Sequence, residues 1–93
     1  MLFRRSVSPA RYELLTREGC HLCEEMAALL DAVLPPLGLA YSLRDVDAAD
    51  TAPELRARFT DVVPVLLRDG RPVAKVRTDR RSLERIVRGH ARS

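Results

Sequence analysis

The chain has no tryptophan, and its aromatic residues are limited to two tyrosines and two phenylalanines. It has no apolar run close to the roughly 20 residues that a membrane-spanning helix needs, and no internal repeat or low-complexity tract. The early basic pair Arg4-Arg5 is not followed by the apolar segment of about 7–15 residues that a secretory signal requires. These absences predict a soluble protein of the cytoplasm that does not bind membranes.

Cysteine and histidine are also scarce. A closed tetrahedral zinc site needs four ligands, and beyond Cys20 and Cys23 the chain offers only His21, which lies between them, and His90, near the C-terminus. We therefore predict no metal and no other bound cofactor. A Cys-x-x-Cys disulfide closes so short a loop that it constrains the unfolded chain little. Two alternatives stay open: cysteines that act as small buried hydrophobes, and a zinc site shared by two chains.

The 93 residues suffice for one hydrophobic core and not for two. The hydrophobic and charged fractions of 46% and 31% are those of an ordinary globular protein. We predict a flexible lead-in over residues 1–10 and a single domain over residues 11–93. The basic charge gathers at the C-terminal end, where residues 71–93 carry 8 Lys and Arg against 2 Asp and Glu, compared with 8 and 11 in residues 1–70.

The first half of the domain has the pattern of a β-α-β unit. Residues 11–16 have strand character and stop at the polar turn 17–19. Apolar residues then recur at three- and four-residue steps over residues 20–34, which predicts a helix that Pro35-Pro36 ends. Residues 39–46 alternate apolar with polar over much of their length. Because a helix connects the two strands, we expect them to pair in parallel.

A short helix and a hairpin are predicted next. Thr51-Ala-Pro-Glu54 has the form of a capping box, with its proline in the first helical turn. Residues 65–68 and 71–76 flank Asp69-Gly70, a pair that supplies the positive φ angles of a tight hairpin turn.

The last element is predicted to be a helix. Thr78 or Asp79 would cap its start, and Gly89 is placed to end it. The order βαβαββα predicts an α/β protein with a central four-stranded mixed sheet flanked by helices. The buried face of the last helix would consist of three apolar residues at helical spacing: Leu83, Ile86 and Val87.

The cysteine pair lies where the first strand leads into the first helix. Unpaired backbone N–H groups and the helix dipole favour an anion there, so Cys20 is the predicted thiolate. Cys23 lies three residues further along the same helix face, one turn inward. In this hypothesis the Cys20 thiolate attacks a partner's disulfide, Cys23 resolves the mixed disulfide, and a second reductant restores the pair.

His21 follows the predicted nucleophile directly and has two interpretations. One is that it stabilises the thiolate or relays a proton. The other is that the helix turns it outward, as a solvent-exposed residue with no role. We assign it an auxiliary role only.

Three features together resemble the thioredoxin fold, and within it the glutaredoxin-like proteins of bacteria: the Cys-x-x-Cys at the first helix, the βαβαββα order, and Val63-Pro64 before the third strand. The resemblance covers about residues 11–89. It implies a cis Val63-Pro64 bond beside the cysteine pair, with the Val63 backbone offered to an extended substrate strand. Arg17, three residues before Cys20, stands where many glutaredoxins keep a lysine, so we give it an auxiliary role.

The sequence departs from the family's pattern at two motifs. The residues between the cysteines are His-Leu, where glutaredoxins usually have Pro-Tyr and thioredoxins Gly-Pro. The Gly-Gly turn that precedes the glutathione-binding aspartate is replaced by Val76-Arg-Thr-Asp-Arg80. Thr78 and Asp79 stay candidates for substrate binding, because they open a helix whose N-terminus favours a carboxylate. We expect glutathione to be at best a weak ligand, although it is a candidate reductant.

The sequence thus predicts a thiol-disulfide oxidoreductase that acts on protein or small-molecule disulfides, with glutathione or a reductase as electron donor. The alternative is a redox-sensing or adaptor module of the same fold that binds a protein or nucleic acid through its basic C-terminal helix. Helical spacing is expected to spread the arginines around that helix, and aromatic residues that stack on bases are few, which disfavours nucleic acid. The arginines in question are Arg77, Arg80, Arg81, Arg85 and Arg88.

Overall fold

The structure, a computed structural model, describes the backbone of residues 11–92 and the side chains up to residue 89. The predicted lead-in over residues 1–10 and the side chain of His90 lie outside the described residues. The predicted βαβαββα order is confirmed, with one 3-10 turn, η1, added after the first helix. The elements are β1 (Tyr12–Thr16), α1 (His21–Val33), η1 (Pro35–Leu37), β2 (Tyr41–Asp45), α2 (Pro53–Phe59), β3 (Val65–Arg68), β4 (Arg71–Lys75) and α3 (Arg80–Arg92).

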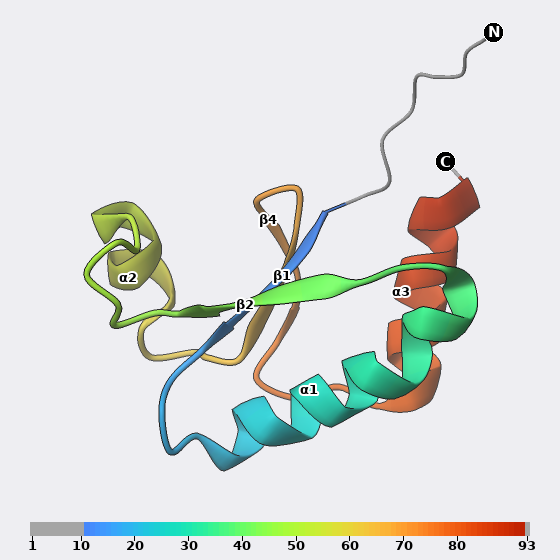
Figure 1. The fold of residues 1–93 in the computed structure, drawn as a ribbon, viewed down its shortest axis with the longest axis horizontal. Helices are drawn as coiled ribbons and strands as arrows, with labels where there is room; N and C mark the ends of the chain where they lie inside the picture. The colour runs from blue at the N-terminus through green and yellow to red at the C-terminus, as the bar shows by residue number, and fades with distance from the viewer. Residues whose placement is uncertain (1–10, 93) are drawn as a thin grey trace, which may run out of the picture.

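The strands form a four-stranded mixed sheet in the order β2-β1-β3-β4. β2 pairs with β1 in parallel, as the helical crossover predicted, whereas β3 is antiparallel to both β1 and β4. The hairpin turns at Asp69 and Gly70, whose φ angles are 50° and 84°. The predicted fold class, with helices on both sides of this sheet, is confirmed (Figure 1).

Alternation along the central strands builds a core on each face of the sheet. α1 and α3 cover one face and α2 covers the other (Figure 1). Among residues 11–92, no helix combines the length and the hydrophobicity that crossing a bilayer requires. The larger core contains Tyr12, Leu14, Met26, Leu30, Val33, Leu34, Leu66, Leu83 and Val87, and the smaller one contains Leu15, Phe59, Val65 and Leu67.

The strand register brings four chain segments to one end of the sheet. Thr16, at the end of β1, pairs with Asp45 at the end of β2. Leu15 pairs with Val65 at the start of β3, and Val65 pairs with Lys75 at the end of β4. The segments that continue beyond this end are residues 17–20, 46–52, 60–64 and 76–79.

The predicted capping box at α2 is wrong. The N-cap residue is Ala52, and no side chain caps the helix. The Thr51 hydroxyl instead donates to the Asp45 carbonyl at 2.6 Å, and its backbone N–H donates to the Ala48 carbonyl at 3.0 Å. Thr51 is buried, so its polar groups serve the β2–α2 connection rather than the helix.

The predicted stop at Gly89 is also wrong, because α3 continues through this residue to Arg92. A glycine that ends a helix does so in the left-handed conformation. Gly89 is not among the glycines with positive φ, which are Gly19, Gly38 and Gly70. A glycine with helical φ lowers helix propensity but does not end the helix.

The hydrogen bond from the Thr51 hydroxyl to the Asp45 carbonyl can be tested by mutation. We expect Thr51→Val to lower the free energy of unfolding by about 0.5–1.5 kcal/mol, because it removes one buried hydrogen bond. Thr51→Ser, which keeps the hydroxyl, should retain most of that energy, and Glu54→Ala should change it by less than about 0.5 kcal/mol. Urea unfolding of the three variants measures this. A loss for Glu54→Ala equal to that for Thr51→Val would restore the capping box.

Candidate functional site

Cys20 and Cys23 form a disulfide at the start of α1, with their Cα atoms 5.2 Å apart. Cys20 is the N-cap residue of the helix, and its Sγ accepts a hydrogen bond from the Cys23 backbone N–H at 3.1 Å. Cys20 is half-buried, whereas Cys23 is only 3% exposed. Cys20, at the helix tip, is therefore the more accessible of the two cysteines. Its sulfur atom is also the one that accepts a hydrogen bond from a helix N–H group.

A turn between β1 and α1 sets the position of Cys20. The Cys20 N–H donates to the Arg17 carbonyl at 3.2 Å, and Gly19, with φ of 75°, occupies the position in this turn that needs a positive φ angle. The Cys20 carbonyl then accepts from the Glu24 N–H at 3.2 Å, which opens the helix. Backbone hydrogen bonds on both sides of Cys20 thus help to hold it at the helix tip.

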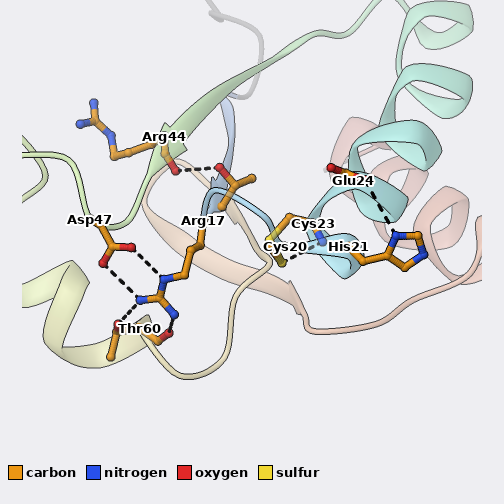
Figure 2. Close-up of a disulfide and its surroundings, with 9 residues drawn as sticks. Arg17, Cys20, His21, Cys23, Glu24, Arg44, Asp47 and Thr60 are labelled. Carbon is orange, nitrogen blue, oxygen red and sulfur yellow. Dashed lines mark hydrogen bonds and ion pairs between the residues drawn. A yellow bond between two sulfur atoms is a disulfide. The ribbon is translucent and has the colours of Figure 1, made fainter.

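The Arg17 side chain joins three of the loops at this end of the sheet. Its guanidinium forms a two-bond ion pair with Asp47, at 2.8 Å and 3.2 Å, and donates to the Thr60 carbonyl at 2.8 Å and to the Thr60 hydroxyl. It points toward these residues and away from the sulfur atoms (Figure 2). The hydrogen bond from Arg17 holds the pKa of Asp47 below its usual value. Arg17 thus connects the cysteine loop, residues 17–20, to the two neighbouring loops on the side away from the sulfur atoms.

His21 lies on the outer side of the helix tip. Its side chain is 81% exposed, with Nε2 at 3.0 Å from Glu25 and Nδ1 at 3.9 Å from Glu24. The ring points away from the sulfur atoms (Figure 2). This arrangement matches the interpretation in which the helix turns His21 toward solvent.

The Val63-Pro64 peptide bond is cis, and Pro64 is buried. Its carbonyl accepts a hydrogen bond from the Val76 N–H at 2.7 Å, which ties the segment before β3 to the segment after β4. Val76 has a φ of 62°, and the Arg77 N–H donates to the Lys75 carbonyl at 2.6 Å across it. This i to i+2 bond makes Val76 the centre of a γ-turn.

An open groove lies between α1 and the segment after β4. It is shallow and open to solvent, with a cavity volume of only about 10 Å³. Leu22, the residue before Cys23, contributes to one wall, so the groove adjoins the cysteine motif. Its lining consists of Leu22, Glu25, Met26, Leu29, Val76, Arg77 and Thr78.

The sequence profile of the family described as Glutaredoxin-like domain (DUF836) matches residues 11–88. The chain belongs to this family. It is 43% identical over 67 residues to uncharacterized proteins of Mycobacterium tuberculosis and Mycobacterium bovis, which covers 70% of this chain and 69% of each relative. The solution NMR structure of protein Ne2328 from Nitrosomonas europaea superposes with a TM-score of 0.67 at 26% identity, over 87% of this chain and 94% of that one.

Family membership and the paired cysteines together support a redox-type function for this glutaredoxin-like domain. No group of three or more potential metal ligands gathers in the part of the chain that the structure describes.

The start of α3 is occupied by the protein's own carboxylate. Asp79 accepts a hydrogen bond from the Ser82 N–H at 2.8 Å, which confirms it as the cap and lowers its pKa. Thr78 lines the groove. In this glutaredoxin-like domain, the anion site expected at this helix N-terminus is therefore partly filled by Asp79.

The arginines that we expected to be spread around the last helix fall on two of its sides. Arg80 pairs with Glu84 at 3.5 Å. Arg81, Arg85 and Arg88 are all exposed, and their i, i+4, i+7 spacing places them on one face of α3, opposite the buried Leu83 and Val87.

Asp47, Thr60 and the γ-turn at Val76 were not predicted from the sequence. Asp47 and Thr60 are 30 and 43 residues from Arg17 in the chain, so no local pattern links them. The loss of the Gly-Gly turn was the one available signal for Val76.

The Arg17 cluster, which consists of Arg17, Asp47 and Thr60, leads to a prediction with a matched control. Arg17→Met should lower the melting temperature and change the rate at which reduced Cys20 is alkylated, because the turn behind the cysteine loses its support. Arg44→Met removes a comparable ion pair, from Arg44 Nε to Glu13 at 2.9 Å, and should change stability alone. Equal alkylation rates in the wild type and both variants would contradict a positioning role for Arg17.

The pH dependence follows from Asp47. Its pKa is lowered in the folded state, so its ion pair with Arg17 stabilises the fold fully above the unfolded-state pKa of about 4 and loses that effect as the pH falls through the folded-state pKa. The difference in stability between the wild type and Arg17→Met should be full at neutral pH and shrink below about pH 4. A difference that stays constant from pH 7 to pH 3 would exclude this ion pair as its source.

Proposed function

We propose that the protein is a thiol-disulfide oxidoreductase in which Cys20 is the nucleophile and Cys23 the resolving thiol. The observation that carries the proposal is the asymmetry of the pair: the accessible Cys20 sulfur accepts the Cys23 N–H at the start of α1, whereas Cys23 is buried. A helix N-terminus and a donated hydrogen bond both favour the thiolate form of a cysteine.

The reaction conserves electrons in two exchanges. The Cys20 thiolate attacks one sulfur of the substrate disulfide, so a mixed disulfide forms and one substrate thiolate leaves. The Cys23 thiolate then attacks the Cys20 sulfur, which releases the second substrate thiol and leaves the Cys20–Cys23 disulfide. A reductase or a thiol such as glutathione returns two electrons to the pair.

Val63 is the proposed platform for an extended protein substrate. Among residues 11–92, neither its N–H nor its carbonyl takes part in a hydrogen bond. It directly precedes the buried Pro64, and the register places residues 60–64 at the same end of the sheet as the cysteine loop. Free backbone groups in this position support pairing with an incoming strand.

Glutathione fits this site poorly as a ligand. A valine side chain occupies the turn where the family resemblance implies glycines, and Asp79 already uses an N–H at the start of α3. Both features support a dithiol mechanism with a protein disulfide as substrate.

Reduction of insulin disulfides, with dithiothreitol as reductant, tests the proposal. We expect Cys20→Ser to abolish turnover, and Cys23→Ser to lower it and accumulate a mixed disulfide through Cys20. Mass spectrometry of the reduced wild type, treated briefly with iodoacetamide at mildly acidic pH, should find Cys20 alkylated first. Faster labelling of Cys23 would reverse the assignment, and full insulin turnover by Cys20→Ser would refute it.

The role of glutathione is tested with the same Cys23→Ser variant. A charge-assisted hydrogen bond left unmade costs about 1.5–3 kcal/mol, and about 1.4 kcal/mol corresponds to a tenfold change in affinity. We therefore expect Cys23→Ser, which turns over only through a Cys20–glutathione intermediate, to reduce a small glutathione mixed disulfide at least about tenfold more slowly than the wild type does in the same glutathione-coupled assay. Robust turnover by Cys23→Ser would show a monothiol glutaredoxin mechanism.

The exposed face of Arg81, Arg85 and Arg88 favours a second candidate function, a redox-sensing adaptor that docks a partner through α3. Binding of this kind weakens steeply as salt is added. The adaptor is favoured over the oxidoreductase if the protein does not reduce disulfides and if it binds an acidic protein or a nucleic acid in a salt-sensitive way.

A further inference from the structure

The backbone at Val76 adopts a conformation that its side chain disfavours. A φ of 62° is in the left-handed region, which β-branched residues rarely occupy because their branched Cβ crowds the backbone there. A residue held in such a conformation persists only where the surrounding structure enforces it, and residues of this kind concentrate at binding and catalytic sites.

Two short hydrogen bonds enforce it here. The Val76 N–H is held by the Pro64 carbonyl at 2.7 Å, and the Lys75 carbonyl is held by the Arg77 N–H at 2.6 Å. Both bonds use backbone groups only, so a glycine would make the same turn without crowding. The turn does not require a valine.

The core does not require it either. The Val76 side chain is 39% exposed and belongs to neither core cluster. It lines the groove together with Leu22, Met26 and Leu29 of α1. An exposed apolar side chain at a strained position thus completes an apolar groove that begins at the cysteine motif.

Charge at the groove is uneven. Glu25 is next to His21, at 3.0 Å. Arg77, by contrast, has no ion pair with any residue in the described part of the chain. The groove therefore offers apolar surface between Glu25, on α1, and Arg77, which is free to pair with an acidic group.

We propose that Val76 is a specificity-determining residue. With Leu22 it receives an aliphatic side chain of an extended segment in a disulfide-bearing protein, while Arg77 pairs with an acidic residue beside that side chain. The inference rests on the proposed oxidoreductase function and adds the chemistry of its substrate. Glutathione has no aliphatic side chain, so the same groove favours a protein over the tripeptide.

The chemistry at this groove is the two-step exchange. The Cys20 thiolate breaks the substrate disulfide and forms the mixed disulfide while the aliphatic side chain lies between Leu22 and Val76. Cys23 then displaces the segment as a thiol. In the assay below, dithiothreitol supplies the two electrons and becomes its cyclic disulfide.

The test uses two disulfide peptides that are identical except beside one cysteine, where one has Leu-Glu and the other Ser-Gln. The wild type should reduce the Leu-Glu peptide with a kcat/KM about tenfold or more above that for Ser-Gln, mainly through KM. Val76→Gly should bring the kcat/KM values for the two peptides close together. It should nevertheless raise the melting temperature, because it relieves the strained turn. A merely structural valine would lower the melting temperature when removed.

Val76→Thr keeps the branched shape and makes the groove polar, so it should lose part of the preference without a gain in stability. Arg77→Gln should reduce the preference for Leu-Glu over a Leu-Gln peptide. Leu43→Ser is the matched control, because Leu43 is 63% exposed on β2, at the opposite edge of the sheet from β4; it should keep the full preference.

The outcomes separate the two levels of the proposal. Reduction of neither peptide by the wild type would overturn the oxidoreductase function itself. Reduction of both peptides with equal efficiency, or a preference that survives in Val76→Gly and Val76→Thr, would overturn the role of Val76 and leave the oxidoreductase intact. A lower melting temperature for Val76→Gly would also overturn it.

Discussion

The antiparallel pairing of β1 with β3 is the constraint on which the site depends. The Leu15–Val65 register brings the exit from β1 to the entry into β3, two positions 50 residues apart in the chain. Both residues are fully buried, so a shift of one residue would turn each of them toward the opposite face of the sheet and disrupt both cores. Core packing therefore holds the cysteine loop and the Val63-Pro64 segment at the same end of the sheet.

Around this end, each loop is held by backbone or charge contacts from another. Arg17 connects the cysteine loop to Asp47 and Thr60, and the Pro64 carbonyl holds Val76. These contacts hold the Arg17 guanidinium on the side away from the sulfur atoms, whereas the groove beside the cysteine motif combines apolar side chains with Glu25, Arg77 and Thr78. Such a division suits the dithiol mechanism proposed above, which needs a rigid nucleophile and an open surface for its partner.

The departures from the glutaredoxin pattern are linked through this geometry. Replacement of the glycine turn puts the Val76 side chain into the groove, Asp79 uses an N–H at the start of α3, and Arg17 points away from the sulfur atoms. These are the positions at which we expect glutathione to lose contacts. Together they are consistent with a site whose substrate is recognised through aliphatic side chains.

Local chemistry was enough to predict the element order, the Asp69-Gly70 hairpin, the Asp79 cap and the placement of Cys20 at a helix start, because short-range periodicity and turn preferences determine them. Predictions that depended on competing partners failed: Thr51 bonds to the β2–α2 connection instead of capping α2, and α3 continues past Gly89. The Arg17 cluster and the turn at Val76 arise only when the sheet joins segments distant in the chain. The sequence by itself determined which two cysteines pair at the start of a helix, whereas only the tertiary structure decided what surrounds them, because long-range strand register is set by burial and not by local preference.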